Sequence, residues 1–294
     1  RDVAPSRGLG DVYKRQNYLK IRNTARYILG NLFDFDPKTN AVAYADMPEL
    51  DKWALMKLND LAAKVREGYD SYEFHTVFHA IHNFCVVDMS NFYFDVLKDR
   101  LYTSAPESAT RRAAQTVLYK VLDALTLLLT PILAYTADEI WLAMPHDSSR
   151  NGESPLFNEI PKAEFIKADE EFIAKWDRIH EVRTDVQKAL ELARNEKIIG
   201  KPLEASVTLY ADGELYDFLK SVENQLPEIF ITSYVAVENG EGAVKGDVEG
   251  LSVTVSKADG EKCERCWKYS HTVGENADHP ALCSHCADVM KEIG

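Results

Sequence analysis

The chain has 294 residues, of which 46% are hydrophobic and 28% charged, so it can bury one large core or two medium ones. Its formal net charge of −13 argues against a protein that coats nucleic acid nonspecifically. The longest apolar run, residues 125–135, contains Thr126, Thr130 and Pro131 and is too short and interrupted to cross a bilayer. No apolar secretion signal is visible, so we expect a cytoplasmic protein without membrane contact.

Residues 1–16 show no clear periodicity, and we leave this unmatched N-terminal segment outside the predicted fold. Residues 12–33 contain no acidic residue, which is unusual in so acidic a chain. Five basic residues fall inside this stretch: Lys14, Arg15, Lys20, Arg22 and Arg26. The stretch is either an ordinary solvated helix face or a local surface for RNA, and charge alone favours the former.

From residue 18 to about residue 194 the apolar residues recur at helical spacing. The first expected helix carries a stripe of Ile21, Ala25, Ile28 and Leu32. A second helix is expected after Asp46, Pro48 and Glu49, which form a helix-start pattern. A third segment runs from residue 72 to residue 101.

The fourth helix is predicted to start at a capping box formed by Ser104 and Glu107, with Pro106 in the first turn. Pro131 should kink this helix before Trp141. A fifth helix is expected over residues 169–194. Five mostly long amphipathic helices predict an antiparallel bundle over residues 17–199.

The sequence pattern changes at Gly200. Residues 206–210, 231–237 and 251–256 are rich in β-branched side chains and predict strands, and residues 215–226 predict an amphipathic helix. The glycine-rich, acidic residues 238–250 predict a loop. Residues 200–258 should therefore form a small α+β subdomain.

Four of the five cysteines lie near the end of the chain, in two Cys-x2-Cys pairs separated by sixteen residues: Cys263, Cys266, Cys283 and Cys286. Four thiolates at this spacing predict a closed, structural zinc site in a module of residues 259–294. A redox dithiol is the alternative, but it normally has a single such pair beside a βαβ pattern. Because four cysteines complete the shell, we expect His271, His279 and His285 not to be ligands.

Aromatic and basic side chains follow the first cysteine pair: Arg265, Trp267, Lys268 and Tyr269. Such a group can stack on unpaired bases while its cations meet phosphates. The alternative is that Trp267 only covers the metal site. Both roles are compatible, because packing occupies one ring face.

His75, His79 and His82 share one face of an expected helix, but aromatic residues interleave with them and no carboxylate stands at a metalloprotease spacing. We therefore predict packed or hydrogen-bonded histidines there. The sequence contains no P-loop, nucleotide-binding glycine loop or nucleophile motif, so we predict no catalytic residue.

Several motifs resemble isoleucyl-tRNA synthetases of the bacterial type, in the order found in that family, from about Tyr18 to the end. In chain order they cover residues 20–26, 29–32, 34–37, Asp51 with Trp53, 88–93, 98–102, 129–133, 138–141, 198–205 and 260–267. The helical part alone also resembles valyl- and leucyl-tRNA synthetases. Residues 98–102 and the four-cysteine module favour the isoleucyl type.

The resemblance implies an anticodon-binding helical bundle, a small α+β subdomain and a four-cysteine zinc module. The partner that it implies is the anticodon stem-loop of isoleucine tRNA, and from their charge and spacing we predict Arg22, Arg26, Arg265, Trp267 and Lys268 as the tRNA contacts. The family's ATP-handling signatures, His-Ile-Gly-His and Lys-Met-Ser-Lys-Ser, do not occur in this sequence. We therefore expect a truncated, catalytically inactive monomeric piece whose partners include the catalytic and editing domains, with ATP used only by the catalytic domain.

Two other interpretations remain open. One is a stand-alone protein without a ligase partner. It would be either an adaptor whose zinc module binds protein, which the acidic charge mildly favours, or a tRNA-binding protein. The other is an independent enzyme that uses the histidine face, which no nucleophile or open metal site supports.

Overall fold

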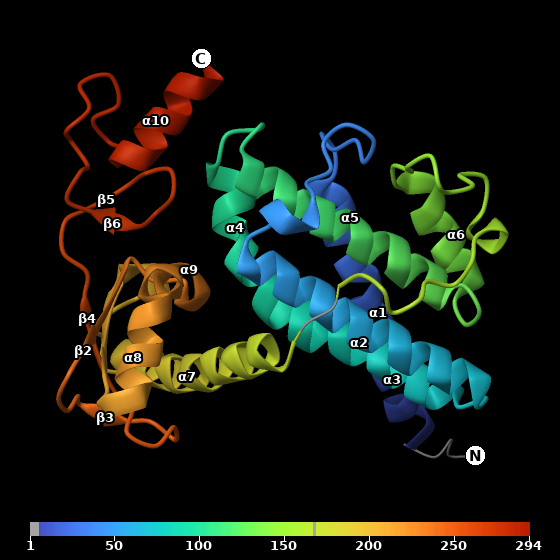
Figure 1. The fold of residues 1–294 in the computed structure, drawn as a ribbon, viewed down its shortest axis with the longest axis horizontal. Helices are drawn as coiled ribbons and strands as arrows, with labels where there is room; N and C mark the ends of the chain where they lie inside the picture. The colour runs from blue at the N-terminus through green and yellow to red at the C-terminus, as the bar shows by residue number, and fades with distance from the viewer. Residues whose placement is uncertain (1–5, 167–168) are drawn as a thin grey trace. The chain divides into compact units, whose positions relative to one another are not determined.

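The computed structural model describes residues 6–166 and 169–294 (Figure 1). These residues form two compact units. Within the described residues, the first unit comprises 6–102 and 106–166, and the second comprises 103–105 and 169–294. In the part of the chain that the structure describes, no helix is long and apolar enough to cross a membrane.

The first unit is helical throughout. Its elements are α1 (Ser6–Asn31), η1 (Tyr44–Asp46), α2 (Glu49–Asp70), α3 (Phe74–Asn83), η2 (Phe84–Tyr93), α4 (Phe94–Thr103), α5 (Ala109–Leu129), α6 (Ala134–Ala143) and η3 (Pro155–Phe157). Helix α5 lies at the centre, because nearly all of its residues from Arg111 onward are buried and it contacts α1, α2 and α6. Helix α1 begins at Ser6, so it includes residues left outside the predicted fold.

The elements α3, η2 and α4 follow one another without a break, and η2 is a π-helical segment. The hydroxyl of Tyr93, at its end, lies 2.5 Å from Oδ1 of Asp51 in α2. The guanidinium of Arg100 in α4 donates to Oδ2 of the same carboxylate at 2.6 Å. Because Asp51 is fully buried, these partners compensate a charge that would otherwise be costly inside the unit.

The helix starts and ends predicted from local sequence were only partly correct. Helix α2 begins after Pro48, as expected. The capping box at Ser104 was wrong, because α5 begins at Ala109 and Glu107 instead pairs with Arg112 at 2.6 Å. Pro131 does not kink a continuing helix, since α5 ends before it and α6 starts as a separate helix. Proline lacks the amide hydrogen and its ring clashes with the preceding turn.

The second unit begins with α7 (Glu170–Asn195), whose N-cap Asp169 accepts from the amide of Phe172 at 2.8 Å. After η4 (Pro202–Glu204) come β1 (Ala205–Tyr210), α8 (Gly213–Val222), η5 (Glu223–Gln225), α9 (Leu226–Phe230), β2 (Tyr234–Glu238), β3 (Val244–Lys245) and β4 (Ser252–Lys257). The sheet order is β2-β1-β4-β3, with β1 parallel to β2 and antiparallel to β4.

Helix α7 packs against β4 and α9. It therefore belongs structurally with the sheet, whereas the pattern change at Gly200 assigned it to the bundle. The rest of the unit contains the hairpin of β5 (Glu261–Lys262) and β6 (Tyr269–Ser270) and the final helix α10 (Ser284–Ile293). The predicted fold class, a helical bundle followed by an α+β part and a cysteine module, is confirmed.

Candidate metal centre and nucleic-acid interface

The hairpin β5–β6 presents the first cysteine pair. At its tip the amide of Cys263 donates to the carbonyl of Lys268, and the amide of Trp267 donates to the carbonyl of Cys263, both at 2.9 Å. Trp267 has a left-handed φ of 65°, which lets the chain reverse within this short turn. The turn brings Cys263 and Cys266 to one side of the hairpin.

The start of α10 presents the second pair. Cys283 is the N-cap residue, Cys286 lies in the first turn, and the amide of Ala287 donates to the carbonyl of Cys283 at 2.9 Å. The two halves are joined because the amide of Glu264 donates to the carbonyl of Ala281 at 3.1 Å.

The four sulfur atoms lie within 4.8 Å of one another. Cys266 Sγ and Cys283 Sγ are 3.9 Å apart, and a zinc tetrahedron with bonds of ~2.3 Å requires sulfur separations of ~3.8 Å. Cys263 and Cys286 are fully buried and Cys283 is nearly so. This donor set fits one structural zinc ion. Among the described residues no other group of metal-ligating side chains forms, and the three nearby histidines lie outside the cluster.

The thiols of this cluster are electrostatically coupled. A hydrogen bond from the Cys286 thiol lowers the pKa of Cys266 to about 5. The same hydrogen bond, together with burial, raises the pKa of Cys286. One thiol of the pair therefore loses its proton readily while the other keeps it, so binding of a metal by all four sulfurs must release protons.

Trp267 projects from this centre and is 55% exposed. The Nζ atoms of Lys201 and Lys262 lie 5.5 and 5.7 Å from its ring centroid, within cation–π range. Sequence reasoning missed both lysines. Both lie within motifs named above, residues 198–205 and 260–267, but only Lys262 is near Trp267 in sequence, and Lys201 reaches the ring through the fold.

Arg265 and Lys268, the other two predicted tRNA contacts in this module, already have partners within the chain. Arg265 is partly buried and donates to the carbonyl of Thr103 at 2.5 Å, inside the second unit. Lys268 is also partly buried and has a partner within the chain.

Arg22 and Arg26 lie on the exposed face of α1. Among the arginine side chains that the structure describes, these two alone make no hydrogen bond, ion pair or ring contact. Two unpaired guanidinium groups one helical turn apart are suited to binding anions.

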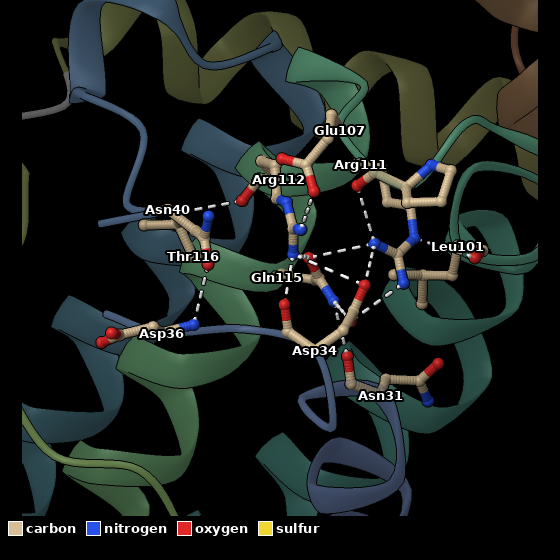
Figure 2. Close-up of polar contacts among 11 residues, drawn as sticks. Asn31, Asp34, Asp36, Asn40, Leu101, Glu107, Arg111, Arg112, Gln115 and Thr116 are labelled. Atoms are coloured by element: carbon tan, nitrogen blue, oxygen red, sulfur yellow. Dashed lines mark hydrogen bonds and ion pairs between the residues drawn. The ribbon is translucent and has the colours of Figure 1, made fainter. Parts of the chain in front are cut away.

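A polar network fixes the chain just after α1 (Figure 2). Arg111 donates to Asp34 Oδ2 at 2.7 Å and to Oδ1 at 3.0 Å, and Gln115 donates to Oδ1 at 2.7 Å. Arg112 donates to the backbone carbonyl of Asp34 at 2.7 Å. Both arginines are nearly buried, so Asp34 compensates charge that α5 brings into the unit.

The histidine face of α3 is at the surface. His75 and His79 are exposed and His82 is partly buried, so these histidines lie at the surface of the unit and not in its core. His75 Nε2 lies 3.4 Å from the hydroxyl of Thr76. Within the described part of the chain these histidines join no group of metal ligands.

Two protein families match parts of this chain. The family described as "Anticodon-binding domain of tRNA ligase" matches residues 51–209, and "Zinc finger found in FPG and IleRS" matches residues 260–289. A protein named isoleucine–tRNA ligase from Desulforamulus reducens is 50% identical over 94% of this chain. Proteins of the same name from Caldanaerobacter subterraneus and Bacillus mycoides are 47% and 48% identical over the same share. The chain spans 30% of the length of each.

Proposed function

Because the chain belongs to the family of anticodon-binding domains of tRNA ligases, we propose that it recognises the anticodon stem-loop of isoleucine tRNA as part of an isoleucine–tRNA ligase. The name shared by its relatives supports the choice of isoleucine. The longer protein would attach isoleucine to its tRNA with ATP in the cytoplasm. The present residues would supply RNA recognition, without forming isoleucyl-adenylate themselves, as a monomer with the catalytic and editing domains as partners.

The observation that carries this proposal is that the guanidinium groups of Arg22 and Arg26 are exposed and unpaired. The other described arginines are held by partners inside the protein, whereas these two project into solvent from a helix that has no acidic residue between residues 12 and 33. In a chain with a net charge of −13, a local cationic face is where a phosphate backbone can bind. The two side chains project from one helix face and can meet successive phosphates.

The metal module supports RNA binding at a second surface. We propose that Cys263, Cys266, Cys283 and Cys286 hold one zinc ion and thereby fix the turn that carries Trp267. The exposed face of this ring can stack on an unpaired base, with Lys201 and Lys262 beside it to meet phosphates. Arg265 and Lys268 lie on the same turn and would add positive charge.

A filter-binding comparison of isoleucine tRNA with other tRNAs tests the proposal. We expect selective binding by the full chain. The double substitution Arg22→Gln, Arg26→Gln should weaken binding to every tRNA alike and lower the salt slope by about one for each phosphate that is no longer neutralised. Arg194→Gln is the matched control, because Arg194 is exposed but paired with Glu191 at 2.6 Å.

Trp267→Ala should weaken binding by roughly 1–3 kcal/mol, while Trp267→Phe should retain most of the affinity. Zinc content is measured in both variants, because a loosened metal turn imitates the loss of stacking. Equal affinity of the wild-type chain for all tRNAs would overturn the proposal. Unchanged binding by the double arginine variant and by zinc-replete Trp267→Ala would exclude these two surfaces.

A further inference from the structure

Phe33, two residues after the end of α1, exposes its apolar ring to solvent. It is 81% exposed, although its neighbour Leu32 and nearby Phe35 are 4% and 5% exposed. A single exposed apolar residue is common on protein surfaces. The backbone on either side of Phe33, however, is fixed by hydrogen bonds that keep its ring out of the core.

Hydrogen bonds fix the chain on both sides of Phe33. The amide of Leu32 donates to the carbonyl of Leu29 at 3.2 Å, and the amide of Phe35 donates to the carbonyl of Leu32 at 3.1 Å. The next residue, Asp34, accepts hydrogen bonds from three side chains (Figure 2). Arg111 and Gln115 donate to its carboxylate, and Arg112 donates to its backbone carbonyl. Turning the ring of Phe33 into the core would require breaking this buried network.

The exposed face of α1 leads directly to this ring. Arg22, Arg26 and Gly30 follow one another at intervals of four residues along one face of α1, and Phe33 comes three residues after Gly30, in the turn just beyond the helix. No acidic residue occurs between residues 12 and 33. Two carboxylates near the end of α1 are paired, Asp34 with Arg111 and Asp95 with Lys98.

Gly30 is the second unusual residue on this face. A Cβ built on it would meet no atom within 4 Å, and its φ lies outside the left-handed region. Packing and backbone conformation therefore do not require glycine here, and glycine inside a helix is less stable than alanine. A site where a ligand's backbone comes close to the helix does favour glycine.

We propose that Phe33 is a stacking platform for an unpaired RNA base, with Gly30 leaving room for the adjoining sugar and with Arg22 and Arg26 binding the flanking phosphates. The proposal rests on the proposed function and adds the group that engages a base. An RNA segment fits better than an apolar protein segment, because the ring comes directly after a helix that carries two unpaired guanidinium groups.

Substitutions of Phe33 in the full chain test the platform, with a transcript of isoleucine tRNA as the probe. Phe33→Ala should weaken binding roughly 5- to 150-fold, which is the range found when a base–aromatic stack is removed. Its salt slope should stay the same, because every phosphate-binding group is retained. Phe33→Tyr keeps the ring and should bind within about twofold of the wild type.

Gly30→Ala separates binding from stability. It should raise the melting temperature or leave it unchanged, because alanine favours the helix and meets no neighbour. It should nevertheless weaken binding to the transcript. Tyr135→Ala is the matched control, because it removes a ring that is 92% exposed on α6 of the same unit and should bind like the wild type.

A double-mutant cycle identifies the stacked base. Transcripts with one abasic nucleotide in the anticodon loop are compared on wild-type and Phe33→Ala protein, and at one position the two losses should not add. Additive losses at every loop position, or a Phe33→Ala protein that binds like the wild type, would overturn this inference and leave the proposed function standing. Failure of the wild-type chain to bind the transcript would overturn both. If Phe33→Ala instead reduces association with the catalytic part of a ligase, the ring is a protein contact and the inference is wrong.

Discussion

The carboxylate of Asp34 and the guanidinium of Arg111 face each other through two hydrogen bonds, of 2.7 and 3.0 Å, that join the loop after α1 to the start of α5. The arginine side chain is only 8% exposed, so the pair is shielded from water. A bidentate geometry of this kind fixes direction as well as distance. It therefore fixes the loop that carries Phe33.

Removal of this carboxylate should destabilise the first unit strongly. Asp34→Ala leaves Arg111 and Arg112 without their shared partner in a nearly buried position, at a cost of about 3–5 kcal/mol. Urea unfolding followed by circular dichroism measures the change. Asp36→Asn, which alters an exposed carboxylate two residues away, should stay within about 0.5 kcal/mol. A small effect of Asp34→Ala would mean that the two arginines find other partners.

Acid should weaken the same contact. Burial alone would raise the pKa of Asp34, but the hydrogen bonds from Arg111 and Gln115 lower it overall. A carboxyl whose folded pKa is depressed contributes stability above its unfolded pKa, about 4, and this contribution disappears as pH falls through the folded value. The free energy of unfolding should therefore drop below about pH 4, and less steeply in Asp34→Asn. Parallel acid curves for the two proteins would contradict this assignment.

Asp88 in the π-helical segment should behave in the opposite way. Burial raises its pKa to about 6, opposed by Lys57 and reinforced by the charge on Asp60. Its protonated form is favoured in the folded state, so the stability it contributes is present at low pH and disappears as pH rises through about 6. Asp88→Asn should stabilise the protein at pH 8 by roughly 1–2 kcal/mol and have little effect at about pH 4. The gain should shrink in an Asp60→Asn background, where the repelling charge is gone.

The purified, reduced chain should hold one zinc ion, and Cys283→Ser should lose it. Metal content is measured by atomic emission after dialysis without chelator. The helices of the first unit should remain folded, since the cluster lies in the second unit. Cys85→Ala, at a buried cysteine outside the cluster, should keep its zinc. A metal content near zero in the wild-type protein would contradict the assignment.

Gly260, just before the cysteine hairpin, should not tolerate a side chain. A Cβ there would lie 2.5 Å from the backbone carbon of Ser270, which cannot move without opening β5–β6. Gly274 has a similar left-handed φ, 96° against 91°, but open space around it. Gly260→Ala should therefore cost about 1–3 kcal/mol more than Gly274→Ala. It should also release zinc faster to a chromogenic chelator, and equal release rates would show that the hairpin adapts.

The periodic parts of this structure could be predicted from sequence because their causes are local. The stripe Ile21, Ala25, Ile28 and Leu32 is buried as expected, since apolar residues at helical spacing have one way to leave water. The strand segments were found from β-branched composition, although β2 begins three residues later than predicted. The cysteine cluster followed from spacing alone.

The remaining features depend on contacts between distant parts of the chain. The capping box at Ser104 failed because Glu107 is engaged by Arg112, and no local pattern reports that competition. The π-helical segment was missed because helical periodicity does not distinguish a widened turn from a regular one. Helix α7 was assigned to the bundle because its apolar face does not indicate which partner covers it. The role of Asp34 is visible only after α5 brings Arg111 and Gln115 beside it.

The topology of the second sheet has a consequence for how the protein emerges from the ribosome. Strand β1 lies between β2 and β4, so its backbone pairing is complete only after β4, which ends at Lys257, has been synthesised. Helix α7 is synthesised first, yet its apolar side chains, among them Trp176, Ile179 and Val182, are covered largely by elements made later. The first unit can complete its core while this helix is still unshielded. Slow translation between residues 195 and 257 should therefore prolong the exposure of one apolar helix, and chaperones should bind the nascent chain there.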